Sequence, residues 1–152
     1  MLLLVTFGPP MLMLIAFSLQ NMGPDGFRAW METFVLIIAS SVVIGVLYTS
    51  ISVAVSASTD RIPVATATIL ALIPGSATVT DTMVAEAGVA PEVRLLNLLF
   101  LPRALVFRLY REPGGWPTSD NPTWTLWAAL AAWILLALGF TWYRYRKLLV
   151  RR

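Results

Sequence analysis

Cysteine and histidine are both missing from the 152 residues of this chain. Without cysteine there can be no disulfide framework, thiolate metal site or cysteine nucleophile. Without histidine the chain also lacks the most common general base and the usual protein ligand of zinc and haem. Any chemistry of the protein would therefore have to come from carboxylates, hydroxyls, cations or backbone groups.

Charged residues are also scarce. They make up 12% of the sequence, about half of the usual share of roughly a quarter, while 58% of the residues are hydrophobic. High hydrophobicity with little charge excludes an intrinsically disordered chain. It also leaves too few polar residues to cover the surface of a soluble domain. We therefore expect an integral membrane protein, and the length allows about four or five spanning helices of ~20 residues.

The basic residues are unevenly placed. The net charge of +3 comes from 11 basic and 8 acidic residues. Five of the cations crowd the C-terminus behind an apolar run, which is typical of a cytoplasmic membrane flank rather than of a nucleic-acid-binding surface. We therefore expect membrane lipid, and no nucleic acid, as a partner of this end. The five cations are Arg144, Arg146, Lys147, Arg151 and Arg152.

Four apolar stretches predict spanning helices. The first has no positive residue before it and no small-residue cleavage site after it, so a span is favoured over a signal peptide. Its start without a flanking charge suggests that the chain is part of a longer protein. The third is interrupted by Pro74-Gly75, and here a kinked span is favoured over a hairpin. The predicted spans are residues 1–20, 33–57, 62–80 and 124–143.

Turn signals separate these spans. The sequence Gly23-Pro24-Asp25-Gly26 predicts a turn, and Trp30 follows it where an aromatic interface anchor is expected. Thr59 or Asp60 is placed to cap the helix that begins near residue 62. Clustered proline and glycine over 112–122 predict a loop.

The segment 92–111 is apolar but carries several arginines. An arginine at the centre of a bilayer costs on the order of 2.5–3.5 kcal/mol on insertion scales, and Arg103 would lie there if this segment crossed the membrane. We therefore predict two short amphipathic helices, split at Pro102, that lie in or dip into the interface. A fifth span is the alternative. Four polar residues of the segment would share one helix side, namely Arg94, Asn97, Arg108 and Arg111.

These elements give one predicted topology. The basic tail places the C-terminus in the cytoplasm, and four spans then place the N-terminus and the Arg61 loop inside and residues 81–123 outside. The expected fold is an all-α, polytopic integral membrane protein of the cell membrane. It is a single transmembrane domain over residues 1–152, with four transmembrane helices and a pair of short amphipathic extracytoplasmic helices.

Small and hydroxyl-bearing residues supply the candidate functional positions. Ser41, Gly45, Ser52 and Ser56 follow one another on a face of the second span. Such a face allows close helix approach, either within the chain or along a conduit wall or dimer seam. The third span is rich in hydroxyls, which either bond carbonyls of their own helix or line a polar path. These residues are Thr66, Thr68, Ser76, Thr78 and Thr80.

No enzyme motif is present. The sequence has no G-x-x-x-x-G-K-[ST] loop to hold a nucleotide. No pair of carboxylates lies inside an apolar span, as a proton relay or a metal site would need. We therefore predict no catalytic residue, no cofactor and no metal ligand, and we expect that the chain is not an enzyme. Energy for any active transport would come from a partner.

Two parts of the sequence resemble a known family. The first is the run Ile44–Ser58, where small residues precede the short loop Thr59-Asp60-Arg61 and a helix with Ala65 and Ala67. The second is the C-terminus, where Trp133 and Leu138-Gly139-Phe140 precede the tail Tyr143–Leu148. Together with a pair of short outer helices before the last span, this order resembles that of ABC transporter permeases of the type 2 exporter class. The resemblance covers nearly the whole chain but only the C-terminal half of such a permease.

The resemblance implies a transport subunit. Such permeases form dimers and work with two ATPase subunits, so the expected partners are a separate ATP-binding subunit and another permease subunit, in a homo- or hetero-oligomer. In that setting the loop with Asp60 and Arg61 would lie near the ATPase. The alternative from a different class is a small, non-transport membrane scaffold or assembly partner of another membrane protein.

Overall fold

The computed structural model describes residues 2–110 and 122–150, with the side chains of 7–90, 92–110 and 122–147. Within these residues every regular element is a helix, which confirms the expected all-helical class. Most of the predicted loop over 112–122, with Trp116, and the cations Arg111, Arg151 and Arg152 lie outside the described residues. The elements are α1 (Leu2–Leu19), α2 (Gly26–Ser58), α3 (Ile62–Ala85), η1 (Pro91–Leu96), α4 (Phe100–Leu109) and α5 (Thr123–Val150).

Three of the helices are long and apolar enough to cross a membrane, namely α2, α3 and α5. At a rise of ~1.5 Å per residue, each is longer than a hydrocarbon core of ~30 Å. In α1, the part whose side chains are described is a shorter apolar helix, Phe7–Leu19. The helix α4 has 10 residues and a length of about 15 Å, so it is too short to span.

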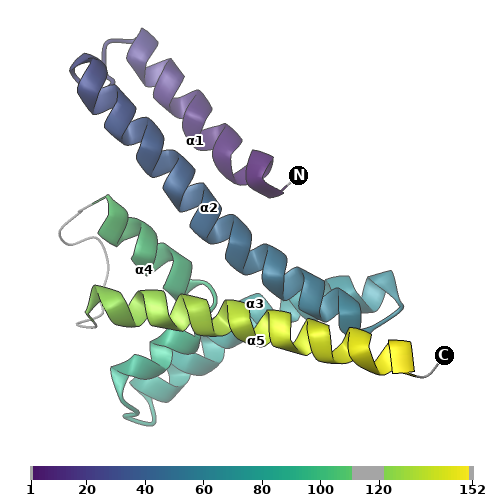
Figure 1. Cartoon of the computed structure of the whole chain (residues 1–152). Helices are drawn as coiled ribbons and strands as arrows, with labels where there is room; N and C mark the ends of the chain where they lie inside the picture. Colours follow the sequence, from purple (N-terminus) through teal and green to yellow (C-terminus); the bar gives the residue numbers. More distant parts are fainter. Residues whose placement is uncertain (1, 111–121, 151–152) are drawn as a thin grey trace. The chain divides into compact units, whose positions relative to one another are not determined.

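The chain divides into two compact units, Met1–Val46 and Leu47–Arg152. In the first unit α1 and the first part of α2 run side by side as an antiparallel hairpin (Figure 1). Aromatic rings join them, because the ring of Phe7 meets the edge of Phe34 with 6.3 Å between centroids. Trp30 stacks on the same Phe34 at 5.6 Å. The contact of Phe7 with Phe34 therefore joins the two helices, and the Trp30 stack within α2 supports it.

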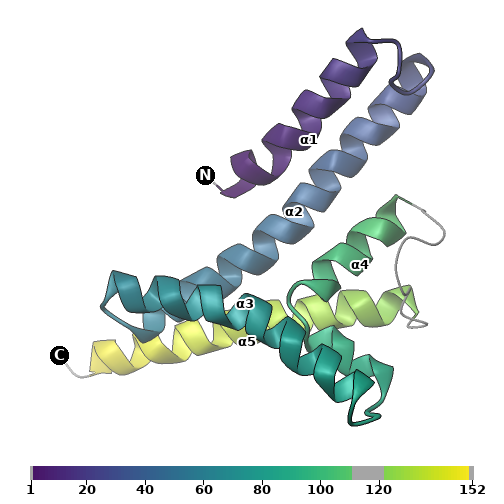
Figure 2. The ribbon, with the colours of Figure 1, turned by 180° about the vertical axis from the view of Figure 1, so that it is seen from behind.

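In the second unit the short elements pack on the long helices. The helix η1 packs against α3, and α4 packs against α5 (Figure 2). Several leucines of this unit are fully buried, and their van der Waals contacts contribute to the packing of its helices. The fully buried leucines are Leu47, Leu98, Leu101, Leu105 and Leu126.

The predicted limits of α2 and α3 differ from the structure. The helix α2 begins at Gly26, seven residues before the predicted start of its span. Gly26 has φ = 85°, a left-handed conformation that glycine adopts readily at a turn. The helix α3 runs without interruption through Pro74 and ends at Ala85. The predicted span through Pro74-Gly75 is therefore one helix and not a hairpin.

The predicted split at Pro102 is wrong. The segment does form two short helices, but the break between them lies at residues 97–99. Pro102 is instead the third residue of α4, where a proline is tolerated because the first-turn N–H groups have no partner within the helix. Because the segment is not one continuous helix, Asn97 does not share a helix side with Arg94 and Arg108.

The predicted cap of α3 is also wrong. The residue before the helix is Arg61, and no side chain caps the first turn. The hydroxyl of Thr59 accepts a bond from the N–H of Arg61 at 3.2 Å, outside the helix. Pro63 in the first turn lacks an N–H, so one fewer donor needs a cap. The start of α3 therefore needs less side-chain capping than an ordinary helix.

Candidate functional site

The break between η1 and α4 is held by hydrogen bonds from several side chains. It consists of Asn97, Leu98 and Leu99, and we call it the Leu98 junction. The side-chain oxygen of Asn97 accepts bonds from the N–H groups of Leu99 and Phe100, both at 2.9 Å. Asn97 is only 3% exposed. Its side chain thus replaces the helical partners that the first N–H groups of α4 lack.

The peptide groups of Leu98 are held from two other helices. The hydroxyl of Tyr48, on α2, donates to the carbonyl oxygen of Leu98 at 3.0 Å. The N–H of Leu98 donates to the hydroxyl oxygen of Ser76, on α3, at 3.1 Å. That hydroxyl in turn donates to the carbonyl of Ile73 at 2.8 Å. Both polar backbone groups of a buried, non-helical residue are thereby satisfied within the protein.

The helix α5 contributes the third contact. The indole N–H of Trp133 donates to the carbonyl of Leu95, the fifth residue of η1, at 3.4 Å. Each of the three long apolar helices therefore offers one polar side chain to this pair of short elements. Such an arrangement is what non-helical backbone requires where water is excluded. It holds the pair in place through bonds to backbone groups.

A second polar contact lies at the other end of the same helices. The guanidinium of Arg144, on α5, donates to the carbonyls of Ala57 and Ser58 at 3.3 and 3.4 Å. These are among the last carbonyls of α2, which have no N–H partner inside their own helix. Arg144 therefore caps α2 from another helix and brings the ends of α2 and α5 to one level. Sequence reasoning identified Arg144 only as one cation of a membrane flank.

The depth of the Leu98 junction can be counted from that level. Tyr48 precedes Ser58 by ten residues, Ser76 follows Ile62 by fourteen, and Trp133 precedes Arg144 by eleven. At ~1.5 Å per residue, these separations are about 15, 21 and 16 Å along the helices. The junction is thus about half a hydrocarbon thickness away from the Arg144 end.

A mainly apolar groove runs between these two levels, with a volume of ≈ 420 Å³. We call it the α2–α5 groove. Its walls come from α2 and α5, with one residue from α3, and its two ends are marked by Ser58 and Trp133. The lining residues are Ile51, Ala54, Val55 and Ser58 of α2, Leu72 of α3, and Trp133, Leu136, Ala137 and Phe140 of α5.

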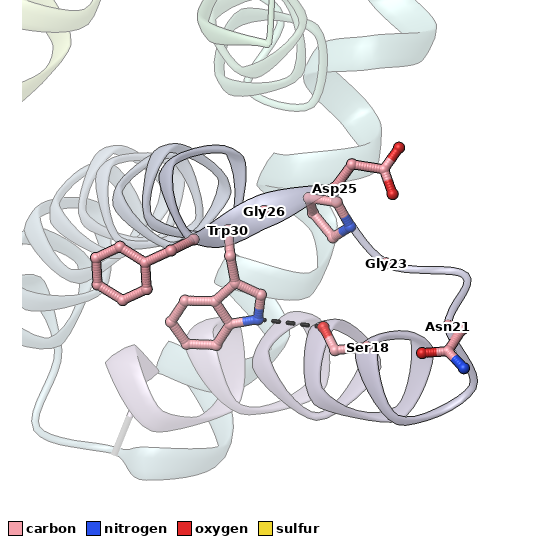
Figure 3. A pocket seen from close by; sticks show the side chains of 8 residues that line it. Ser18, Asn21, Gly23, Asp25, Gly26 and Trp30 are labelled. Atoms are coloured by element: carbon pink, nitrogen blue, oxygen red, sulfur yellow. Dashed lines mark hydrogen bonds between the residues drawn. The ribbon is translucent and has the colours of Figure 1, made fainter.

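The turn between α1 and α2 forms a separate pocket of ≈ 380 Å³ in the first unit. Figure 3 shows the indole N–H of Trp30 donating to the hydroxyl of Ser18, at 3.1 Å. A Cβ on Gly23 would lie 2.8 Å from that hydroxyl oxygen and 2.9 Å from the Cα of Ser18, so only glycine fits. Trp30, predicted as an interface anchor, therefore also ties the two helices of the hairpin together.

The predicted small-residue face is spread over different environments. Ser41 and Gly45 are buried, Ser52 is half-buried and Ser56 is exposed. Its role in helix packing or in a conduit stays a prediction. Asp60 and Arg61 are both exposed, in the loop between α2 and α3, and their contact with a partner stays a prediction as well.

The five hydroxyls of α3 that were singled out in the sequence bond carbonyls of their own helix. Thr66 donates to Ile62 at 3.1 Å, and it is exposed. Ser76 differs because it also accepts the N–H of Leu98. Bonding to carbonyls of the same helix is one of the two roles expected for these hydroxyls. The other role, lining a polar path, stays a prediction. The remaining donors are Thr68 to Val64, Thr78 to Pro74, and Thr80 to Ser76 and Ala77.

Sequence reasoning missed Tyr48, Asn97 and Trp133 as members of a site. An asparagine flanked by leucines is a usable sequence signal, because asparagine competes with helical backbone bonding and favours breaks. In the described part of the chain, no group of three acidic side chains could hold a metal ion. No family model, no curated protein and no solved structure matches this chain.

Proposed function

We propose that this chain is a transmembrane permease subunit of an ATP-driven exporter of the ABC type 2 class. The Leu98 junction is the observation that carries the proposal. A pair of short helices between α3 and α5 is held by one side chain from each of three long apolar helices. The order of two long helices, a short outer pair and a last long helix is the one that the sequence resemblance implies.

In the proposed topology four helices cross the cell membrane, namely α1, α2, α3 and α5. The bond from Arg144 to Ala57 supports it, because the ends of α2 and α5 then lie on one face. With α3 and α5 each crossing once, η1 and α4 return to the side from which they came. The basic tail assigns the Arg144 face to the cytoplasm and η1 and α4 to the outer side.

The subunit would form part of the translocation path and of the dimer surface, without catalysis of its own. The resemblance implies a second permease subunit and separate ATPase subunits whose closure on nucleotide drives alternating access. The loop of Asp60 and Arg61 would face those ATPase subunits. The buried Ser41 and Gly45 would permit close helix approach.

Purification of the native complex from membranes, followed by identification of its members, tests the proposal. A nucleotide-binding subunit in near-stoichiometric amount is the expected result. Replacing Asp60 and Arg61 together by alanine should weaken its retention, whereas the double change of Arg28 and Glu32, an exposed ion pair in the first unit, should not. A complex with another membrane protein and no such subunit would support a scaffold instead. ATP bound tightly by the purified chain alone would contradict both.

A further inference from the structure

The α2–α5 groove has the composition and the ends of a lipid site. Eight of its nine lining side chains are apolar or aromatic, and the ninth, Ser58, lies at the Arg144 end. Leu136 and Phe140 are 67% and 47% exposed although they line a hollow. Within a membrane, such side chains contact acyl chains.

A cation lies at the polar end of the groove. Arg144 bonds the carbonyl of Ser58, a lining residue, and follows Phe140, another, by four positions on the same side of α5. The bonds to Ala57 and Ser58 use two of the five N–H donors of the guanidinium, and a guanidinium matches the geometry of a phosphate. The groove therefore ends where an anionic headgroup would be recognised.

The length of the groove matches one leaflet. From Arg144 to Trp133 α5 rises by eleven residues, or about 16 Å, which is close to half of a hydrocarbon core of ~30 Å. The indole N–H of Trp133 is bonded to Leu95, so the deep end is fixed by the Leu98 junction. A single acyl chain that starts at the headgroup level would reach this end.

We propose that the α2–α5 groove binds one acyl chain of an anionic phospholipid, whose phosphate is held by Arg144. This site goes beyond the transport proposal and requires only that α2, α3 and α5 span the membrane. The bound lipid would fill the space between α2 and α5 and link the Arg144 end to the Leu98 junction. The ligand is a membrane constituent that binds without forming or breaking a covalent bond.

Two variants with matched controls test the site. Ala54→Phe places a ring in the groove, and Ala132→Phe places one on an exposed position of α5 outside it. Arg144→Gln removes the charge at the polar end, and Arg146→Gln removes an exposed charge of the same tail. Arg144→Lys restores a charge without the planar fork. Circular dichroism would first establish that each variant keeps its helix content.

The measurement uses the purified chain in detergent with added phosphatidylglycerol or phosphatidylcholine, read by native mass spectrometry. We expect one phosphatidylglycerol per chain, retained over phosphatidylcholine by about fivefold, as one cation near a lipid surface provides. Arg144→Gln should abolish the preference and Arg144→Lys should restore part of it. Ala54→Phe should lose both lipids, while the two controls behave like the unmodified chain.

A phosphatidylglycerol with a photoreactive group in the middle of its acyl chain gives an independent readout. Crosslinks mapped by peptide sequencing should concentrate at Ile51, Leu72 and Trp133. Crosslinks spread evenly over all exposed apolar positions, or equal retention by Ala54→Phe and the unmodified chain, would overturn the site. If Arg144→Gln fails to fold, the comparison of Ala54→Phe with Ala132→Phe still tests the site. A positive result with no ATPase in the native complex would keep the lipid site and reject the exporter.

Discussion

The phenol of Tyr48 and the carbonyl of Leu98 lie 3.0 Å apart, although fifty residues separate them in the chain. The bond joins the second half of a long helix to the middle of a break between two short ones. Because the carbonyl belongs to a fully buried residue, water cannot replace the phenol as its partner. This bond and that of Ser76 to the N–H of the same residue define the position of η1 and α4.

Removing this phenol should destabilise the second unit. Tyr48→Phe leaves a buried carbonyl without its donor, and we expect a loss of about 1 kcal/mol in the free energy of unfolding. Unfolding by SDS in mixed micelles measures the change. Tyr143→Phe is the control, because Tyr143 is 64% exposed. Equal losses for both variants would show that the Tyr48 bond does not hold the junction.

Asn97 should determine the stability of the start of α4. Asn97→Ala removes the acceptor for Leu99 and Phe100, and loss of such a side-chain acceptor at a helix start costs about 0.5–2 kcal/mol. Amide hydrogen exchange of a peptide covering 98–109 should become faster. Asn97→Ser keeps an oxygen that can cap a helix, so it should retain part of the protection. Unchanged exchange in Asn97→Ala would contradict the assignment.

Gly45 should tolerate no large side chain. It is buried within α2, and Gly45→Leu forces neighbouring groups apart at a cost of about 1–3 kcal/mol. Val42→Leu adds volume at a position of the same helix that is 45% exposed, and it should be neutral. Expression level and SDS midpoint report the difference. If the two variants behave alike, the predicted small-residue face is not a packing face.

The proposed topology predicts the sidedness of three positions. The native chain has no cysteine, so single cysteines can be introduced without background labelling. Arg61→Cys and Arg146→Cys should react with a membrane-impermeant maleimide from the cytoplasmic side, and Ala85→Cys from the outer side. The reagent is applied to intact cells and to inverted vesicles. Labelling of positions 61 and 146 from opposite sides would show that the segment 92–111 crosses the membrane.

The sequence is sufficient to predict most helices because long apolar runs leave few alternatives. The runs that contain α2, α3 and α5 hold almost no charge, so their assignment needs no knowledge of neighbours. The first apolar run predicts a helix on the same ground, and α1 has 18 residues. Helix ends were less predictable. The hairpin of the first unit allows α2 to start at Gly26, since Trp30 bonds Ser18 across it.

Only the Asn97 part of the Leu98 junction has a local signal in the sequence, because the bonds from Tyr48, Ser76 and Trp133 are made over long separations. The break was expected at Pro102, the residue with the strongest local signal, yet a proline in the first turn of a helix costs little. The actual break depends on Asn97 accepting two local N–H groups and on Tyr48, Ser76 and Trp133 arriving from other helices. Hydropathy and spacing carry no information on which helices become neighbours. The role of Arg144 was missed for the same reason.

The bond between Arg144 and Ala57 has a consequence for biosynthesis. The two residues are 87 positions apart, so at about 5–20 residues per second the ribosome adds Arg144 some ~4–17 s after Ala57. During that interval the last carbonyls of α2 have no side chain from α5 to cap them. The capping of this end of α2 is thus completed only after Arg144 has been synthesised. A chain that ends before α5 therefore leaves the carbonyls of Ala57 and Ser58 without this side-chain cap.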